Sequence, residues 1–268
     1  MNALILAAGF GTRLGTYSGG LPKQLVPIHG KPVVEYIVRK LDNTPEVNDI
    51  YLLTNEKFIV NFEDWLRQMN PKPTKPVTLL NNGKFRNEDR NGSVGDILYG
   101  MNQVPQAENE GLLVIQGDDL TPGFSLSEFI QSYQALDEML IIGHKKTKEE
   151  IRNTFGAIEI DPDTNRVTAM DEKPLEPKTD LANGGYYLFS PEAIQKTHEY
   201  RLELLKEHKA TNPDQPFYLD NTGKLFDWLV KNSLPMFVHH YEGPWFDIGK
   251  KEILDAATEY FANPNAKY

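Results

Sequence analysis

A glycine-rich turn with two nearby cationic side chains lies close to the start of the chain, in the stretch LILAAGFGTRLGTYSGGLPKQ (residues 4–24). Its apolar beginning is typical of a buried strand, and a turn after the first strand of an α/β sheet can bring unpaired backbone N–H groups close to a phosphate. Arg13 lies inside the turn, and Lys23 follows ten residues later. Because both side chains are positively charged at neutral pH, the stretch predicts a phosphate-binding site.

The spacing of the glycines separates three kinds of phosphate-binding loop. A P-loop needs Gly-Lys followed by Ser or Thr, whereas Lys23 follows Pro22 and precedes Gln24. A dinucleotide-binding turn needs a small residue at the last position of its pattern, where this chain has Leu14. An arginine inside the turn adds a cationic fork that suits the β- and γ-phosphates of a nucleoside triphosphate. The stretch therefore favours a triphosphate and argues against NAD.

Two adjacent carboxylates, Asp118 and Asp119, end the apolar stretch LLVIQGDDL (residues 112–120). Open α/β sheets bind their ligands at the carboxyl ends of the strands. Carboxylate oxygens are ligands for Mg²⁺, which can cancel charge between two phosphorylated substrates. Asp118 and Asp119 are therefore both candidate metal ligands, although a strand-end aspartate more often caps a helix.

The elements that must position these residues alternate along the first half of the chain. Short apolar runs predict strands, and the amphipathic segments between them predict helices. One such segment carries an apolar stripe at helical spacing, formed by Phe58, Phe62, Trp65, Leu66 and Met69. Near-continuous apolar strands are typical of a parallel sheet with helices on both faces. The predicted fold class is α/β, with three layers and a mostly parallel sheet. The predicted strands are residues 3–9, 49–55, 77–82, 112–118 and 139–145, and the predicted helices are residues 32–41, 56–69, 93–104 and 125–136.

The pattern changes after about residue 147. FGAIEIDPDTNRVTAMDEKP (residues 155–174) predicts two strands joined by a turn with Pro and Asp, and NGGYYLFS (residues 183–190) predicts a further strand. Residues 191–208 and 221–230 predict helices. We expect a single domain, residues 1–268, with a nucleotide-binding half at 1–145 and a second half with the C-terminal helix at 146–260.

Composition narrows the class of protein. The 268 residues carry a net charge of −10, which argues against nucleic-acid binding, because that needs a basic surface. The absence of cysteine excludes disulfides, thiolate catalysis and cysteine-bound zinc. The sequence shows neither a signal-peptide pattern nor an apolar run of about 20 residues. We expect a cytoplasmic protein with no membrane partner, and the composition is compatible with a homo-oligomer.

Two longer motifs give the chain a resemblance to a known family. LAAGFGTRL (residues 6–14) followed by LPKQLVPIHGKPVVEY (residues 21–36) is similar to the signature of the sugar-phosphate nucleotidyltransferases, the family of glucose-1-phosphate thymidylyltransferases and their uridylyl and cytidylyl relatives. The resemblance implies a Rossmann-like nucleotidyltransferase fold with a small sugar-binding lobe. It departs from the family in GTYSGG (residues 15–20).

The resemblance implies roles for residues that contact the nucleotide and the metal. The family's loop wraps the triphosphate, its arginine contacts the departing pyrophosphate and its lysine stabilises the reacting α-phosphate, which makes Arg13 and Lys23 the catalytic residues. Its Gly-Asp pair and its Trp-x-Asp-x-Gly segment, here WFDIG (residues 245–249), assign the two metal ligands to Asp118 and Asp247. A helix with Ser93 as its expected N-cap presents a small residue to the base. The nucleotide-binding residues implied are Ala8, Gly9, Gly11, Thr12, Gly95 and Gln116.

The second half resembles the part of the family that binds the sugar phosphate. MDEKP (residues 170–174) matches a Glu-Lys-Pro segment whose glutamate binds sugar hydroxyls and whose lysine binds the acceptor phosphate. FGAIEID (residues 155–161) resembles a Tyr-Gly strand, with Phe155 in place of the tyrosine, and LANGGYYLF (residues 181–189) resembles the strand that closes the sugar pocket. The sugar-phosphate-binding residues implied are Gly156, Glu172, Lys173, Asn183 and Gly184.

The activity implied is transfer of a nucleoside monophosphate from a nucleoside triphosphate to a sugar 1-phosphate, with Mg²⁺ as cofactor and pyrophosphate as the second product. Glucose 1-phosphate with dTTP or UTP is the expected pair of substrates. One alternative is a CTP-dependent cytidylyltransferase that acts on phosphocholine or another alcohol phosphate, which would need an aromatic box, whereas Glu172 suits hydroxyls. The other alternative is a non-catalytic subunit that binds a nucleotide sugar.

Overall fold

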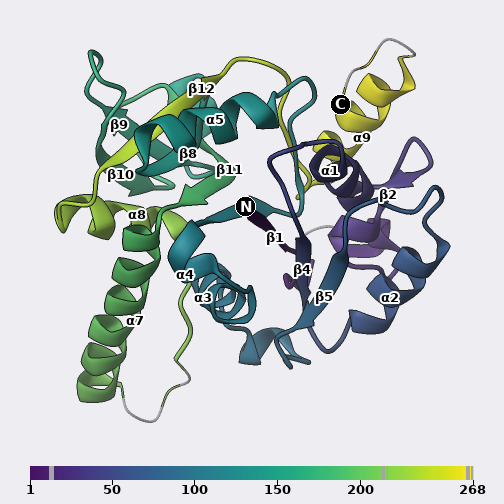
Figure 1. Cartoon of the computed structure of the whole chain (residues 1–268), viewed down its shortest axis with the longest axis horizontal. Helices are drawn as coiled ribbons and strands as arrows, with labels where there is room; N and C mark the ends of the chain where they lie inside the picture. Colours follow the sequence, from purple (N-terminus) through teal and green to yellow (C-terminus); the bar gives the residue numbers. More distant parts are fainter. Residues whose placement is uncertain (12–14, 213–214, 216, 264–265, 267) are drawn as a thin grey trace. The chain divides into compact units, whose positions relative to one another are not determined.

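The computed structural model describes residues 1–11, 15–212, 215, 217–263, 266 and 268, and the chain forms two compact units. The first unit consists of Met1–Arg90, Ile115–Glu128 and Gly243–Tyr268, and the second of Asn91–Val114 and Phe129–Glu242. The colours of Figure 1 show that each unit combines stretches that are far apart in the sequence.

A parallel sheet forms the centre of the first unit. Strands β1 (Asn2–Leu6), β4 (Ile50–Thr54) and β5 (Val77–Asn81) pair in parallel, and β1 is buried throughout. The end of β6 (Leu112–Gln116) lies against the end of β1, because the N–H of the next residue, Gly117, donates to the last carbonyl of β1 at 2.9 Å. The predicted apolar runs therefore form buried strands.

Helices α1 (Val33–Asp42) and α2 (Ile59–Gln68) lie beside this sheet (Figure 1). In the predicted apolar stripe of α2, Phe62 and Trp65 are buried and Leu66 is half-buried. The helix begins later than predicted, because the Asn55 side chain accepts a hydrogen bond from the Phe58 N–H at 3.1 Å and forms a turn there.

Short elements complete the first unit. Strand β7 (Asp119–Leu120) pairs antiparallel with β13 (Phe246–Asp247), and β2 (Pro27–Ile28) with β3 (Lys31–Pro32). The unit ends in helix α9 (Lys251–Ala262). Among the described residues of this unit, 3-10 helices lie at Gly15–Ser18, Lys23–Leu25 and Asn87–Asp89.

The second unit has a mixed sheet. Strand β8 (Met139–Lys145) pairs in parallel with β12 (Met236–Tyr241) and antiparallel with β11 (Leu181–Phe189). Strand β11 also pairs antiparallel with β9 (Gly156–Ile160), which forms a hairpin with β10 (Val167–Glu172). The Asp161 carboxylate accepts from the N–H groups of Asp163 and Thr164 at 2.9 and 3.1 Å, so the predicted turn with Pro and Asp joins the two hairpin strands.

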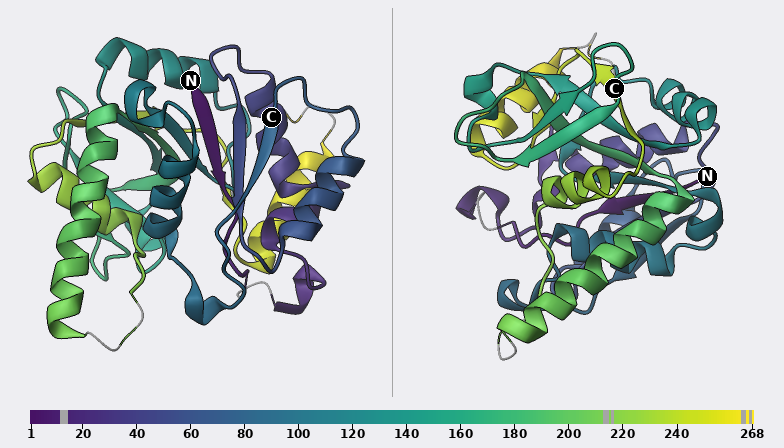
Figure 2. Two further views of the ribbon diagram at one scale, coloured as in Figure 1. Left: turned by 60° about the horizontal axis from the view of Figure 1, so that its bottom comes forward. Right: turned by 90° about the vertical axis from the view of Figure 1, so that its left-hand side faces the viewer.

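Helices pack on this sheet and on one another. Figure 2 shows the long helix α7 beside α3. Helix α7 begins at Pro191 because the Ser190 side chain caps it, accepting from the Ala193 N–H at 3.2 Å. No helix of the described residues is long and apolar enough to cross a membrane. The helices are α3 (Ser93–Gln103), α4 (Ala107–Glu110), α5 (Leu126–Leu136, in this unit from Phe129), α6 (Lys148–Ile151), α7 (Pro191–Thr211) and α8 (Thr222–Lys231).

Candidate functional site

The loop after β1 has the backbone that a phosphate site needs. The Ala8 carbonyl is fixed by the Asn55 side chain, whose Nδ2 donates to it at 2.8 Å. A Cβ atom at Gly9 would meet nothing within 4 Å, and Gly11 has a φ of +65°, a conformation that favours glycine. A Cβ atom at Gly11 would lie 3.5 Å from the backbone nitrogen of Lys23. The glycines therefore leave one side of the loop open and bring the other side close to Lys23. The predicted site residues Thr12 and Arg13 lie outside the described residues.

Lys23 lies among the carboxylates of the first unit. Its Nζ donates a hydrogen bond to Asp118 Oδ2 and forms an ion pair with it. Burial lowers the pKa of Lys23, but the negative charges of Asp118 and Asp247 oppose burial and leave this pKa above its ordinary value. Lys23 therefore carries a full positive charge at neutral pH.

Two very short strands bring the acidic residues together. In the β7–β13 pair, Asp247 lies opposite Asp119, and the Ile248 N–H donates to the Asp118 carbonyl at 3.0 Å. Asp119 is buried, and the Trp245 indole N–H donates to its Oδ1 at 3.0 Å. Burial raises the pKa of Asp119 well above its ordinary value, and the charges of Asp247 and Asp118 raise it further. We call Lys23, Asp118, Asp119 and Asp247 the acidic cluster.

The acidic cluster contains carboxylate oxygens of the kind that bind Mg²⁺. Within the part of the chain that the structure describes, no group of three or more His, Cys, Asp or Glu side chains is arranged to hold a metal ion. Mg²⁺ is usually held by one or two carboxylates together with water and substrate phosphates. Two neighbouring carboxylates, Asp118 and Asp247, therefore fit a magnesium ion that is completed by the phosphates of a nucleotide.

A glycine that sequence reasoning missed controls how closely this cluster is packed. Gln116, a predicted nucleotide-binding residue, ends β6 and is half-buried. At the following Gly117, a Cβ atom would lie 2.6 Å from the Leu6 carbonyl oxygen and 3.2 Å from Gln24 Cγ. Only glycine allows β1, β6 and the segment that carries Lys23 to approach in this way.

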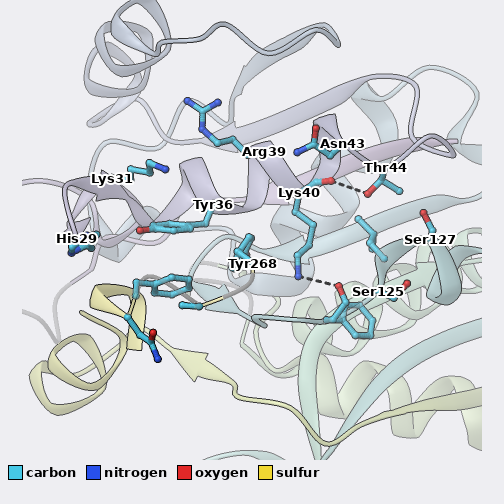
Figure 3. A pocket seen from close by; sticks show the side chains of 15 residues that line it. His29, Lys31, Tyr36, Arg39, Lys40, Asn43, Thr44, Ser125, Ser127 and Tyr268 are labelled. Atoms are coloured by element: carbon cyan, nitrogen blue, oxygen red, sulfur yellow. Dashed lines mark hydrogen bonds between the residues drawn. The ribbon is translucent and has the colours of Figure 1, made fainter. Parts of the chain in front are cut away.

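A cavity of about 540 Å³ lies in the first unit, lined by residues of α1, of the segment 124–127 and of the C-terminal stretch (Figure 3). Lys40 points into it from α1, and its Nζ donates to the Thr121 and Phe124 carbonyls at 2.7 and 3.2 Å. Burial lowers the pKa of Lys40 to about 7. Because Thr121 directly follows β7, Lys40 fixes the loop that follows this strand, which carries Asp119.

The predicted sugar-phosphate residues gather in the second unit. Glu172 lies opposite Gly156 in the β9–β10 hairpin, and a Cβ atom at Gly156 would lie 3.7 Å from Glu172 Oε2 and 3.5 Å from Asn183 Cβ. Asn183 Nδ2 donates to the Tyr187 hydroxyl at 3.3 Å, while Asn183 Oδ1 is buried without a hydrogen-bond partner among the described residues. A buried acceptor of this kind costs about 1–3 kcal/mol, and a ligand hydroxyl could satisfy it.

The two remaining sugar-phosphate candidates have different surroundings. Lys173 follows β10 with a φ of +51°, and its Nζ lies 3.7 Å from Glu172 Oε1. At Gly184, a Cβ atom would lie 2.8 Å from Ile142 Cγ2. Glycine at position 184 is therefore explained by the packing of β11 against β8.

The start of helix α3 differs from the prediction. Ser93 is not the N-cap but the first helical residue, because Gly92 takes the cap position with a φ of +82°. Asp220 instead accepts hydrogen bonds from the Ser93 N–H and hydroxyl at 3.2 and 3.0 Å. The predicted cap was wrong because a carboxylate from a distant stretch supplies the missing acceptor.

Glycines at the start of α3 are required by a neighbouring segment. A Cβ atom at Gly92 would lie 2.2 Å from the Leu219 carbonyl oxygen, and one at Gly95 would lie 2.9 Å from Asn91 Cβ. The Gly95 N–H donates to the Leu219 carbonyl at 3.1 Å. Packing within the second unit is thus sufficient to explain both glycines, and a role for Gly95 beside a base stays a prediction.

The sequence is similar to that of known nucleotidyltransferases. Residues 2–263 match the family model described as nucleotidyl transferase. The chain is 29% identical over 251 residues to the bifunctional protein GlmU of Methanocaldococcus jannaschii, a match that covers 87% of this chain and 54% of the relative. It is 26% identical over 284 residues to the UTP–glucose-1-phosphate uridylyltransferase of Mycoplasma pneumoniae, with 97% and 91% covered. The chain spans about half the length of the GlmU relatives that it matches.

Solved structures share the fold. A UDP-glucose pyrophosphorylase complexed with UDP-glucose matches with a TM-score of 0.76 at 20% identity, covering 97% of this chain and 98% of that one. The UDP-glucose pyrophosphorylase from Acinetobacter baumannii matches with a TM-score of 0.75 at 18% identity, covering 98% and 94%. The predicted α/β fold, with a mostly parallel sheet flanked by helices, is confirmed.

Proposed function

Because the chain belongs to the nucleotidyl transferase family, we propose that it transfers a nucleoside monophosphate from a nucleoside triphosphate to a sugar 1-phosphate and releases pyrophosphate. The single observation that carries this proposal is the acidic cluster, in which one ammonium and three carboxylates from three separate stretches meet beside the open loop after β1. The name of the Mycoplasma pneumoniae relative supports glucose 1-phosphate as acceptor and UTP as donor, and dTTP is the second expected donor.

The proposed reaction needs no protein base. An oxygen of the sugar phosphate, already ionised near neutral pH, attacks the α-phosphorus of the nucleotide. A bond forms between this oxygen and the α-phosphorus, the bond from the α-phosphorus to the bridging oxygen breaks, and pyrophosphate leaves with the electron pair. Catalysis then consists of positioning the two substrates and stabilising the charge that moves onto pyrophosphate.

Residues of the first unit would hold the nucleotide. A Cβ atom built at Gly9 would have no neighbouring atom within 4 Å, so the backbone there is open and would accept the triphosphate. Arg13 would contact the departing pyrophosphate. Lys23 would break its ion pair with Asp118 and contact the α-phosphate instead. Asp118 and Asp247 would hold Mg²⁺, which when bound supplies neutralising charge between the two anionic substrates.

Residues of the second unit would hold the sugar phosphate. The carboxylate of Glu172 and the buried Oδ1 of Asn183 are both acceptors, and atoms of both side chains lie within 4 Å of the Cβ position at Gly156. Sugar hydroxyls are donors that match these two acceptors. Lys173, whose side chain is 42% exposed, would contact the phosphate of the sugar 1-phosphate.

The test is pyrophosphate release in the presence of Mg²⁺. Glucose 1-phosphate with UTP or dTTP is expected to react, whereas phosphocholine with CTP is expected not to. The Asp118→Asn variant should lose about 100-fold or more in turnover, and the exposed hairpin variant Asp163→Asn serves as the matched control. A folded wild-type sample that releases no pyrophosphate from any pair of nucleotide and sugar 1-phosphate would refute the proposed function.

A further inference from the structure

The start of helix α8 contacts Glu172 in a way that the sequence does not indicate. The Gly223 N–H donates a hydrogen bond to Glu172 Oε2 at 3.1 Å. Gly223 is the second residue of α8, where a backbone N–H has no acceptor within the helix. The favourable electrostatics of a helix N-terminus add to this hydrogen bond. One carboxylate oxygen of Glu172 is therefore fixed by the backbone.

A side chain at the same position would displace the Glu172 carboxylate. A Cβ atom at Gly223 would lie 2.4 Å from Glu172 Oε2, 3.2 Å from Glu172 Cβ and 3.4 Å from Glu172 Cα. The overlap is with the carboxylate oxygen, whereas the distances to Cβ and Cα are a tight and an ordinary contact, so an alanine would force the carboxylate to move. Only glycine allows Glu172 to keep this orientation.

The location of α8 is itself fixed within the second unit. The Leu219 N–H donates to the Asn91 carbonyl at 2.8 Å, and the Leu219 carbonyl accepts from Gly95. Asp220 accepts from Ser93, as described above. These contacts anchor the segment that leads into α8 on the start of α3, so the Gly223 N–H has a defined position.

We propose that Gly223 is a positioning residue of the sugar-phosphate site, because its N–H and its lack of a side chain hold Glu172 in the orientation that accepts sugar hydroxyls. Glu172 Oε2 accepts from the Gly223 N–H, which leaves Oε1, 3.7 Å from Lys173 Nζ, to accept from a sugar hydroxyl. The Asn183 side chain, whose Cβ and Nδ2 lie 3.5 and 3.9 Å from the Cβ position at Gly156, is then kept at a fixed place relative to Glu172. This inference rests on the proposed function.

The experiment is a double-mutant cycle with the full chain. Gly223→Ala should raise the KM for glucose 1-phosphate about 10-fold or more and leave the KM for the nucleotide within about 2-fold. Lys224→Ala, an exposed neighbour in the same turn of α8, should change neither KM. In the Glu172→Ala background, Gly223→Ala should change the KM for glucose 1-phosphate less than about 2-fold, because no carboxylate remains to be displaced.

Thermal unfolding supplies a readout that does not depend on activity. Gly223→Ala should lower the Tm by about 3–6 °C alone, and it should leave the Tm equal or higher in the Glu172→Ala background, where Ala is the better helix former. Equal effects of Gly223→Ala on both KM values, or an equal loss of Tm in both backgrounds, would overturn the inference. A wild-type protein without any transferase activity would instead overturn the proposed function, while the Tm cycle still decides whether Gly223 holds Glu172.

Discussion

Replacing Trp245 with phenylalanine should lower the free energy of unfolding, because it removes a buried hydrogen bond and part of a buried ring. Trp245 and Asp119 are 9% and 6% exposed, and the indole N–H donates to Asp119 Oδ1 at 3.0 Å. A hydrogen bond to a charged group contributes about 1.5–3 kcal/mol, and the smaller phenyl ring loses about 1 kcal/mol of packing. We therefore expect Trp245→Phe to lower the free energy of unfolding by about 2.5–4 kcal/mol.

The partner variant Asp119→Asn separates the hydrogen bond from the charge. Its amide oxygen can still accept from Trp245, while the buried charge that Asp247 and Asp118 repel is removed. In this background the hydrogen bond is neutral and contributes about 0.5–1.5 kcal/mol. Trp245→Phe should then cost about 1 kcal/mol less than it costs in the wild type.

The pH dependence has a definite sign. Burial and the neighbouring carboxylates raise the pKa of Asp119 above its unfolded value of 3.8, so the folded protein keeps this proton longer than the unfolded chain does. The contribution of Asp119 to stability is therefore full below pH 3.8 and declines as the pH rises towards the folded pKa. The stability of Asp119→Asn relative to the wild type should accordingly increase as the pH is raised above 4.

Urea denaturation followed by far-UV circular dichroism measures all four proteins of this cycle. It would be carried out at pH 5 and pH 7, because the two values test the sign of the Asp119 effect. A Trp245→Phe variant within about 0.5 kcal/mol of the wild type would refute the reasoning. An identical cost of Trp245→Phe in both backgrounds would show that the charge of Asp119 plays no part in the contact.

Three further predictions concern the first unit. Gly117→Ala should lower the free energy of unfolding by about 3 kcal/mol or more, because its Cβ would lie 2.6 Å from the Leu6 carbonyl oxygen. Gly9→Ala, the control, should leave the free energy of unfolding nearly unchanged. Urea denaturation compares the two variants, and equal stabilities would contradict this account. Lys23→Met should lower turnover by about 100-fold or more in the pyrophosphate assay while Lys31→Met, an exposed control, should not; a wild-type rate in Lys23→Met would remove Lys23 from the mechanism. Burial lowers the pKa of Lys40 to about 7, so Lys40 loses its proton at a lower pH in the folded protein than in the unfolded chain. The wild type should therefore gain stability relative to Lys40→Met as the pH rises from 7 to 9, by at most about 1.4 kcal/mol per pH unit. Parallel pH profiles of the two proteins would contradict the prediction.

The strands and helices could largely be predicted because burial and periodicity are local properties of the sequence. The apolar run at residues 3–9 indicated β1, and the stripe that contains Phe62 and Trp65 indicated α2. Strands β7 and β13 could not be predicted in the same way, because two residues show no period. Their pairing joins stretches more than 120 residues apart and is accompanied by the hydrogen bond from Trp245 to Asp119.

The chemistry of the site could be predicted only where residue type alone was informative. A glycine loop, a lysine and strand-end aspartates pointed to phosphate and metal. Gly223 gave no comparable signal, because a glycine followed by a lysine near the start of a predicted helix is ordinary. The position of Glu172 relative to Gly223, 51 residues apart in sequence, follows from the packing of α8 on β10. The Ser93 cap failed for the same reason, since Asp220 lies 127 residues away.

The division of the first unit into three stretches has a consequence for biosynthesis. During translation, residues 1–242 emerge before Trp245 and Asp247 exist. A nascent chain of that length has Lys23 and Asp118 but neither β13 nor the indole that contacts Asp119. Assembly of the acidic cluster is thus delayed until residues 243–268 have been made, and ribosome-stalled chains that end at residue 242 should hold Lys23 and Asp118 without the β7–β13 pair.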